Sequence, residues 1–189
     1  MLSITEEKIS LLETLKNGSY LDKVEEVGNV MISTIQRGNK ILLAGNGGSA
    51  ADAQHFAGEI VGRFTMERKA LPAFSLCTDP SVVTCIANDY GYEDVFARQV
   101  AGLGCEGDIF VGISTSGSSK NIENAIEICK KKNIITVAFL GKDGGTIKDL
   151  VDYPLVVPSD STPRIQEIHT LTVHMLCQMI EQGVFSTNE

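Results

Sequence analysis

Two stretches rich in glycine and serine follow two apolar runs of this chain. Residues 45–49 read Gly-Asn-Gly-Gly-Ser after the run 41–44, and residues 114–119 read Ser-Thr-Ser-Gly-Ser-Ser after the run 109–113. A strand that turns into a helix presents unpaired N–H groups and a positive dipole end, which suit a phosphate. Either stretch alone is more simply a tight turn that caps a helix. Two at equivalent positions favour a site for a phosphorylated ligand with a polar body.

A second group of residues could move protons or hold a metal ion. His55 and Glu59 are four residues apart, which places them on one helix face, and Gln166, His169 and His174 fall within nine residues. These nitrogen and oxygen donors suit an ion such as zinc, or a general base and acid. A His–Glu pair at this spacing is more often a solvated ion pair, and a histidine among apolar neighbours is more often a hydrogen-bonded core or interface residue. Spacing alone does not favour a metal and leaves the other interpretations open.

Several further polar residues have weaker claims on a function. Asn88 and Asp89 could bind sugar hydroxyls, but both residue types are also common in turns, and the sequence predicts a turn at 88–91. The glycine-rich stretch 141–145 is interpreted as a plain turn between a strand and a helix. Four arginines are expected mainly in surface or intersubunit salt bridges: Arg63, Arg68, Arg98 and Arg164.

Composition and charge restrict the class of protein. The chain has 189 residues and a formal net charge of −8, which argues against nucleic acid or a membrane surface as partner. The five cysteines include no C-x-x-C pair and are expected to be buried free thiols of a reducing compartment. The N-terminus does not resemble a signal peptide, and no apolar run is long enough for a bilayer. We therefore expect a cytoplasmic protein.

The elements that must position these residues alternate between strand and helix. Amphipathic helices are predicted over 5–37, with a break near 17–18. The alternation that follows predicts an α/β three-layer domain over 1–189 with a five-stranded parallel sheet and a helical N-terminal extension, 1–37. Both glycine- and serine-rich loops then lie at carboxyl ends of strands, where such sheets bind ligands. The predicted strands are 41–44, 73–76, 109–113, 134–140 and 153–157, and the predicted helices are 49–62, 79–87, 93–101, 119–132, 146–150 and 163–182.

Four segments together carry a resemblance to a known family. Residues 44–49, 55–59, 112–117 and 164–169 resemble the phosphoheptose isomerases of the sugar-isomerase (SIS) superfamily, in order and over nearly the whole chain. The Ser-Thr-Ser-Gly loop alone would specify only the superfamily. The resemblance implies one SIS domain with a flavodoxin-like sheet.

The resemblance also implies an activity and an assembly. It implies conversion of sedoheptulose 7-phosphate to D-glycero-D-manno-heptose 7-phosphate through an enediolate, for the heptose of lipopolysaccharide or capsule. It further implies one zinc ion per subunit and a homotetramer, with active sites at subunit interfaces and helices 1–37 used in oligomerisation.

Roles for single residues follow from the matching motifs. Glu59 is implied as the catalytic base and His174 as the acid/base partner. One departure is Pro163, where some members of the family have an acidic residue whose role would be absent here or taken by another group. The implied zinc ligands are His55, Glu59, Gln166 and His174. The implied substrate-binding residues are Asn46, Gly47, Gly48, Ser49, Glu59, Asn88, Asp89, Ser114, Thr115, Ser116, Ser119 and Gln166.

Two other functions remain open for a sequence of this kind. The superfamily includes a regulator that binds the bacterial replication initiator and lacks the catalytic carboxylate and the later histidine, so the presence of Glu59 and His174 favours an enzyme. It also includes sensor domains for amino-sugar phosphates. Those usually accompany a DNA-binding or catalytic domain, for which we expect no room in this chain.

Overall fold

A computed structural model describes residues 2–185 and contains one parallel sheet. Its five strands are β1 (Ile41–Gly45), β2 (Ala73–Ser75), β3 (Ile109–Ser114), β4 (Ile135–Gly141) and β5 (Tyr153–Val157). Their spatial order is β2-β1-β3-β4-β5, and every neighbouring pair is parallel. The predicted α/β fold with a five-stranded parallel sheet is confirmed.

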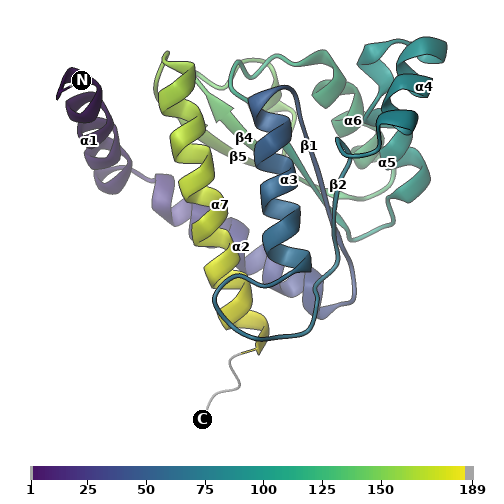
Figure 1. Cartoon of the computed structure of the whole chain (residues 1–189), viewed down its shortest axis with the longest axis horizontal. Helices are drawn as coiled ribbons and strands as arrows, with labels where there is room; N and C mark the ends of the chain where they lie inside the picture. The colour runs from purple at the N-terminus through teal and green to yellow at the C-terminus, as the bar shows by residue number, and fades with distance from the viewer. Residues whose placement is uncertain (1, 186–189) are drawn as a thin grey trace.

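Helices cover both faces of this sheet. They are α1 (Leu2–Asn17), α2 (Tyr20–Gln36), α3 (Gly48–Val61), α4 (Pro80–Tyr90), α5 (Ala97–Leu103), α6 (Lys120–Lys131) and α7 (Thr162–Phe185). The short 3-10 turns η1 (Tyr92–Asp94) and η2 (Ile147–Asp149) complete the set. Helices α2, α3 and α7 share one core cluster with the sheet, and α4, α5 and α6 share the other. Figure 1 shows α3 and α7 side by side in front of the sheet.

Successive residues of each strand point to opposite faces, which divides the core in two. In β1, Ile41 and Leu43 belong to the cluster under α2, α3 and α7, whereas Leu42 and Ala44 belong to the other cluster. All five residues of β1 are buried. The central strands therefore read as continuous apolar runs, as expected for a parallel sheet covered on both faces.

The strand order places a topological switch point between β1 and β3. Helix α3 carries the chain from β1 to β2 on one side, and the chain then returns to form β3 on the other side of β1. The loops after β1 and β3 consequently leave two adjacent strands in opposite directions and open a crevice at the carboxyl edge. Both glycine- and serine-rich loops lie at this edge, as the sequence predicts.

Some local predictions were wrong. The predicted turn at 88–91 is helical as far as Tyr90, because α4 ends only at Gly91, whose φ is +95°. The predicted helix 93–101 is instead η1 followed by α5 at Ala97–Leu103, with the buried residues Val95 and Phe96 between them. The cysteines were expected to be buried, but Cys85 and Cys105 are exposed. Their neighbours Ile86 and Gly104 are the buried positions instead.

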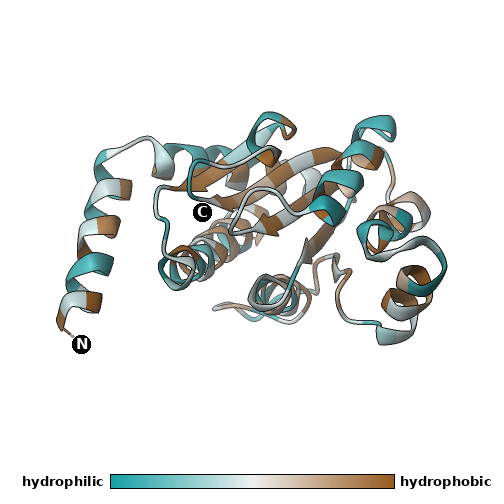
Figure 2. Cartoon of the chain, turned by 90° about the horizontal axis from the view of Figure 1, so that it is seen from above, coloured by the Kyte–Doolittle hydropathy of each residue, from teal (hydrophilic) through white to brown (hydrophobic). Residues whose placement is uncertain are grey.

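The N-terminal helix extends away from the body of the molecule. Figure 2 shows α1 projecting to one side, with apolar residues along its length. Leu11 and Leu15 are buried, whereas Leu2, Ile4 and Ile9 are exposed. The use of helices 1–37 in oligomerisation stays a prediction. No helix within residues 2–185 combines the length and hydropathy needed to cross a membrane.

Two phenylalanines in one row of the sheet test the importance of the core. Phe110 and Phe74 flank Leu42 in register, but Phe110 is fully buried while Phe74 is 53% exposed on the edge strand. We expect Phe110→Ala to lower the free energy of unfolding by about 3–5 kcal/mol, because it leaves a cavity. Phe74→Ala, the matched control, should change it by about 1 kcal/mol or less. Urea unfolding measures both, and equal losses would contradict this description of the core.

Candidate active site

The first loop leaves the N-terminus of a helix open. Gly47, with φ +56°, precedes α3, and no described side chain caps this helix end. Helix α4 differs, because the Asp79 carboxylate accepts hydrogen bonds from the N–H groups of Ser81 at 2.9 Å and Val82 at 3.0 Å. The N–H groups of Ser49 and Ala50 bond to the carbonyls of Asn46 and Gly47, so the Gly48 N–H and the positive dipole end of α3 remain for an anion.

The second loop gathers hydroxyl groups at the start of α6. The Oγ atoms of Ser114 and Ser119 are 2.8 Å apart, and the Ser116 Oγ accepts a hydrogen bond from the N–H of Ser118. No described side chain caps α6 either. Gly117 has φ +67°, and a Cβ there would collide with the backbone of Gly144. The glycine-rich turn 141–145 therefore packs directly against this loop.

Hydrogen bonds join the first loop to its neighbours. The Asn46 Oδ1 accepts from the Nδ2 of Asn121 and from the hydroxyl of Tyr92, both at 2.9 Å. In return the Asn46 Nδ2 donates to the Asn121 Oδ1 at 3.0 Å. Because Asn121 lies in the first turn of α6, this pair fixes the two loops relative to each other. Sequence reasoning missed both Tyr92 and Asn121.

Contacts between α3 and α7 recur at successive turns of the two helices. A Cβ on Gly48 would collide with the side-chain amide of Gln166, and the Thr170 hydroxyl donates to the Asp52 carboxylate at 3.1 Å. One turn further, the rings of His55 and His174 meet. Both helices start at the carboxyl edge of the sheet, so they run in the same direction away from the two loops.

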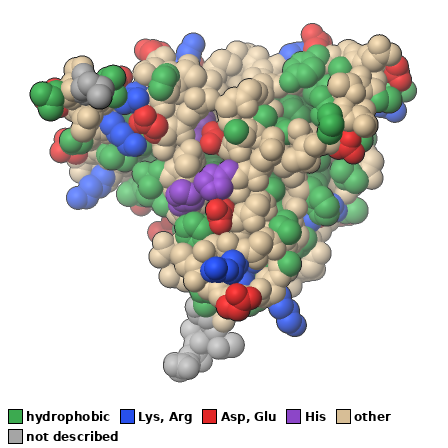
Figure 3. Space-filling model, in the orientation of Figure 1, with side chains coloured by type: hydrophobic (Ala, Val, Ile, Leu, Met, Phe, Trp, Pro, Cys, Tyr) green, Lys and Arg blue, Asp and Glu red, His purple; other side chains and the backbone are tan. Residues whose placement is uncertain are grey.

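Three of the predicted reactive side chains lie together on α3 and α7. His55 Nε2 is 3.1 Å from Glu59 Oε1, and the centroids of the His55 and His174 rings are 5.1 Å apart. Phe64 packs on the other side of His174, with ring centroids 5.6 Å apart. The side chains of His55 and Glu59 are 40% and 26% exposed, so a ligand can reach them. Figure 3 shows the histidines gathered on this face beside an acidic group.

Other predicted site residues lie elsewhere. Gln166 contacts Gly48 and is eight residues before His174, which separates them by about 12 Å along the helix axis. Asn88 and Asp89 are exposed at the end of α4, where the Asn88 Nδ2 donates to the Asp89 carboxylate. Tyr92, just beyond that helix, is the residue of this region that bonds to the first loop.

The side chains around His55 carry donor atoms that a divalent metal binds, but the structure does not arrange them as a metal site. Within residues 2–185, no three histidine, cysteine, aspartate or glutamate side chains form a ready metal cluster. His55, Glu59 and His174 nevertheless bring two imidazoles and a carboxylate close together, which is the donor chemistry that zinc prefers.

Two further titratable groups on α3 and α7 have shifted pKa values. His169 is buried and its Nε2 is 3.2 Å from the Leu140 carbonyl; burial lowers its pKa to about 4, which keeps the ring neutral. The structure thus supports a hydrogen-bonded core histidine at this position. Burial also raises the pKa of Asp52, against the lowering effects of the Thr170 hydrogen bond and the nearby His55. Sequence reasoning missed Asp52, although its spacing places it one turn before His55.

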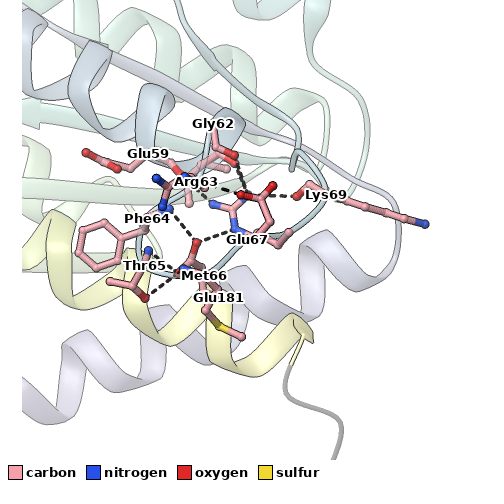
Figure 4. A network of polar contacts seen from close by, with 11 residues as sticks. Glu59, Gly62, Arg63, Phe64, Thr65, Met66, Glu67, Lys69 and Glu181 are labelled. Atoms are coloured by element: carbon pink, nitrogen blue, oxygen red, sulfur yellow. Dashed lines mark hydrogen bonds and ion pairs between the residues drawn. The ribbon is translucent and has the colours of Figure 1, made fainter.

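A buried ion pair holds the segment that follows α3. Arg68 Nε and Glu181 Oε1 are 2.7 Å apart, and both side chains are 1% exposed. Figure 4 shows this network, in which Glu181 accepts hydrogen bonds from the segment's backbone. These bonds lower the pKa of Glu181 to about 2 despite its burial, so the carboxylate is charged at neutral pH. Arg68 is thus an exception among the four arginines, most of which were expected in surface or intersubunit salt bridges.

Comparisons with known proteins agree with this geometry. The SIS domain model matches residues 6–141, more than half of the chain. The phosphoheptose isomerase of Trichlorobacter lovleyi is 54% identical over 162 residues, which cover 86% of this chain and 83% of that protein. The solved structures of phosphoheptose isomerases from Neisseria gonorrhoeae and Francisella tularensis are each 38% identical, with TM-scores of 0.90 and 0.92. The alignments cover 96% and 95% of both chains in each pair, respectively.

The fold and the site together define a SIS-domain sugar-phosphate isomerase. The chain belongs to the phosphoheptose isomerase family and is an aldose–ketose isomerase.

The second loop gives a direct test of phosphate binding. Ser119→Ala removes a hydroxyl that lies 2.8 Å from Ser114 Oγ at the open end of α6. We expect KM for the sugar phosphate to rise by roughly tenfold, since a hydrogen bond to a charged group contributes about 1.5–3 kcal/mol. Part of the loss can appear in kcat, because phosphate binding also stabilises the transition state.

Ser81→Ala is the control for this experiment. Ser81 lies in the first turn of α4, whose N-terminus Asp79 already occupies. Steady-state kinetics should show KM unchanged in this variant. An unchanged KM in Ser119→Ala would exclude Ser119 as a phosphate ligand.

Proposed function

We propose that this enzyme converts sedoheptulose 7-phosphate to D-glycero-D-manno-heptose 7-phosphate. The carrying observation is that α3 starts beside the uncapped end of α6 at the loops and carries His55, which contacts both Glu59 and His174, a reactive carboxylate and imidazole. The names of the relatives support the choice of substrate. A seven-carbon chain with a terminal phosphate has the length and polarity to use such an elongated site.

The phosphate would be held by hydrogen bonds rather than by a cationic field. The net charge of −8 provides no general attraction for an anion. The N–H groups at the starts of α3 and α6, together with the hydroxyls of Ser114 and Ser119, supply local donors. The sugar hydroxyls would bind Asn46, the remaining loop residues and the polar groups near Asn88 and Asp89.

The reaction would be a proton transfer between adjacent carbons. Glu59 would act as the base that removes the proton from the carbon next to the carbonyl, which produces an enediolate. His174 would move protons to and from the oxygens, since an imidazole can accept and donate near neutral pH. His55 holds Glu59 by the 3.1 Å contact and so orients the carboxylate toward the substrate.

We also propose a zinc site made by His55, Glu59, His174 and Gln166. A bound zinc ion would polarise the carbonyl and stabilise negative charge on the enediolate oxygens. A carboxylate held tightly by a metal is a weaker base, so Glu59 or His174 would have to change between metal and proton duties during turnover. Gln166 would have to extend along α7 toward His174 or come from a neighbouring subunit.

Assembly and pathway are part of the same proposal. The apolar residues exposed on α1 suit a helical bundle between copies, and we propose a homotetramer with sites at its interfaces. The heptose product would serve lipopolysaccharide or capsule synthesis.

Two isosteric variants test the proposed acid and base. Glu59→Gln and His174→Gln should each lower kcat by roughly 100-fold or more, the usual contribution of general acid–base catalysis, while circular dichroism stays unchanged. Glu127→Gln, an exposed glutamate on α6, is the control and should retain full activity. Turnover of sedoheptulose 7-phosphate by purified protein gives the measurement. Near-normal turnover in both variants would refute these roles.

The zinc site can be tested without an activity assay. Purified protein should contain about one zinc per subunit, and zinc added to metal-stripped protein should raise Tm, because a ligand that binds only the folded state stabilises it. Mg²⁺, which prefers oxygen ligands, should not raise Tm. His55→Ala should abolish the shift. A shift of the same size in His55→Ala would place any zinc elsewhere.

A further inference from the structure

We propose that Arg68 and Glu181 are positioning residues of the isomerase site. The proposal rests on the roles proposed above for Glu59 and His174. The segment 62–69, which joins α3 to the approach to β2, is held by this buried pair, and it touches both of those residues. The pair would therefore set the distance and angle between base and acid without contacting the substrate.

Glu181 binds the segment through almost its whole hydrogen-bonding capacity. Its Oε1 accepts from the Phe64 N–H and from Arg68 Nε, both at 2.7 Å. Its Oε2 accepts from the N–H groups of Thr65 at 2.8 Å and Met66 at 3.0 Å, and from the Thr65 hydroxyl at 2.9 Å. Three consecutive backbone N–H groups thus point at one carboxylate, which leaves the segment little freedom to move.

Arg68 connects this carboxylate to the end of α3. Its Nη2 donates to the Glu59 carbonyl at 2.8 Å, and its Nη1 donates to the Ile60 carbonyl at 2.9 Å. The last carbonyls of a helix have no partner within the helix, so the guanidinium caps α3 at the residue that carries the proposed base. A planar five-donor group is needed to bind the carboxylate and both carbonyls at once, and lysine cannot replace it.

Phe64 transmits the same constraint to His174. Its N–H is fixed by Glu181, and its ring lies 5.6 Å from the His174 ring, inclined by 30°. Glu181 is seven residues after His174, which is about two turns further along α7. The Glu181 carboxylate consequently orders the segment whose Phe64 ring contacts His174, the proposed acid. Its partner Arg68 contacts the backbone carbonyl of Glu59, the proposed base.

The energetics of a buried ion pair favour a geometric role over a stabilising one. Within residues 2–185, this is the ion pair whose two side chains are both only 1% exposed. Removing two charges from water offsets most of their attraction, and an apolar pair of similar volume is often as stable. What an apolar pair cannot supply is the set of directed bonds to the Glu59 carbonyl and to the N–H groups of 64–66.

Arg68→Lys tests the positioning directly. The lysine keeps the positive charge beside Glu181 but cannot reach both carbonyls at the end of α3. We expect kcat to fall about 10- to 100-fold with KM within about twofold, because the phosphate loops lie at the opposite end of α3 and small displacements of a reacting group reduce rates strongly. Val100→Ala, a cavity in the core cluster on the other face of the sheet, controls for general destabilisation.

A second variant keeps the test decisive if Arg68→Lys does not fold. The double substitution Arg68→Met with Glu181→Leu removes both charges together and should fold. We expect the same loss of kcat, and we expect altered ring signals of His174 in NMR spectra, assigned by comparison with His174→Gln. Val100→Ala should leave those signals in place.

The outcomes separate this inference from the proposed function. Loss of kcat with KM and the Val100→Ala control unchanged supports positioning by the pair. Wild-type kcat in either pair variant, or an equal loss in Val100→Ala, would overturn it while leaving Glu59 and His174 in their roles. Full activity of Glu59→Gln and His174→Gln would instead refute the proposed function itself.

Discussion

The site depends on one constraint, namely that two adjacent parallel strands send the chain in opposite directions. Because β1 leads to β2 on one side and β3 leads to β4 on the other, their loops separate at the carboxyl edge and leave an opening. At that opening α3 and α6 begin without side-chain caps, and the Asn46–Asn121 pair holds the loops together. The proposed binding of an anion there would depend on backbone geometry more than on charge.

The parallel course of α3 and α7 extends this opening into a reaction site. Their contacts run from Gly48 and Gln166 at the loops, through Asp52 and Thr170, to the two histidines. The Arg68–Glu181 pair lies beyond the histidines, at the end of α3 that is remote from the loops. A sugar phosphate bound along α3 and α7 would have its phosphate fixed by hydrogen bonds at the loops and its carbonyl end beside groups that exchange protons. The phosphate-binding end and the reacting end of the proposed site would thus lie at different turns of the two helices.

Features that repeat along the chain could be predicted from the sequence, and those made by distant side chains could not. Alternating strands and helices predicted the sheet, and motif resemblance pointed to Glu59 and His174 as candidates, both of which the structure places in contact with His55. The helix through Asn88 and Asp89 was missed because both residues are common in turns. Arg68 could not be singled out among the four arginines, since nothing local shows that it pairs with Glu181, 113 positions away. Asp52 and Tyr92 are of the same kind, because their partners become neighbours only in the fold.

A crystal structure with an unreactive analogue of sedoheptulose 7-phosphate would test the central claim most directly. The geometry described here predicts the phosphate within hydrogen-bond distance of Ser119 Oγ and of N–H groups at the start of α6 or α3. It also predicts that the carbons corresponding to C1 and C2 lie beside Glu59 and His174, from one chain or from neighbouring chains. A phosphate bound away from both loops, or a Glu59 and His174 that face separate cavities in every pairing of subunits, would contradict it.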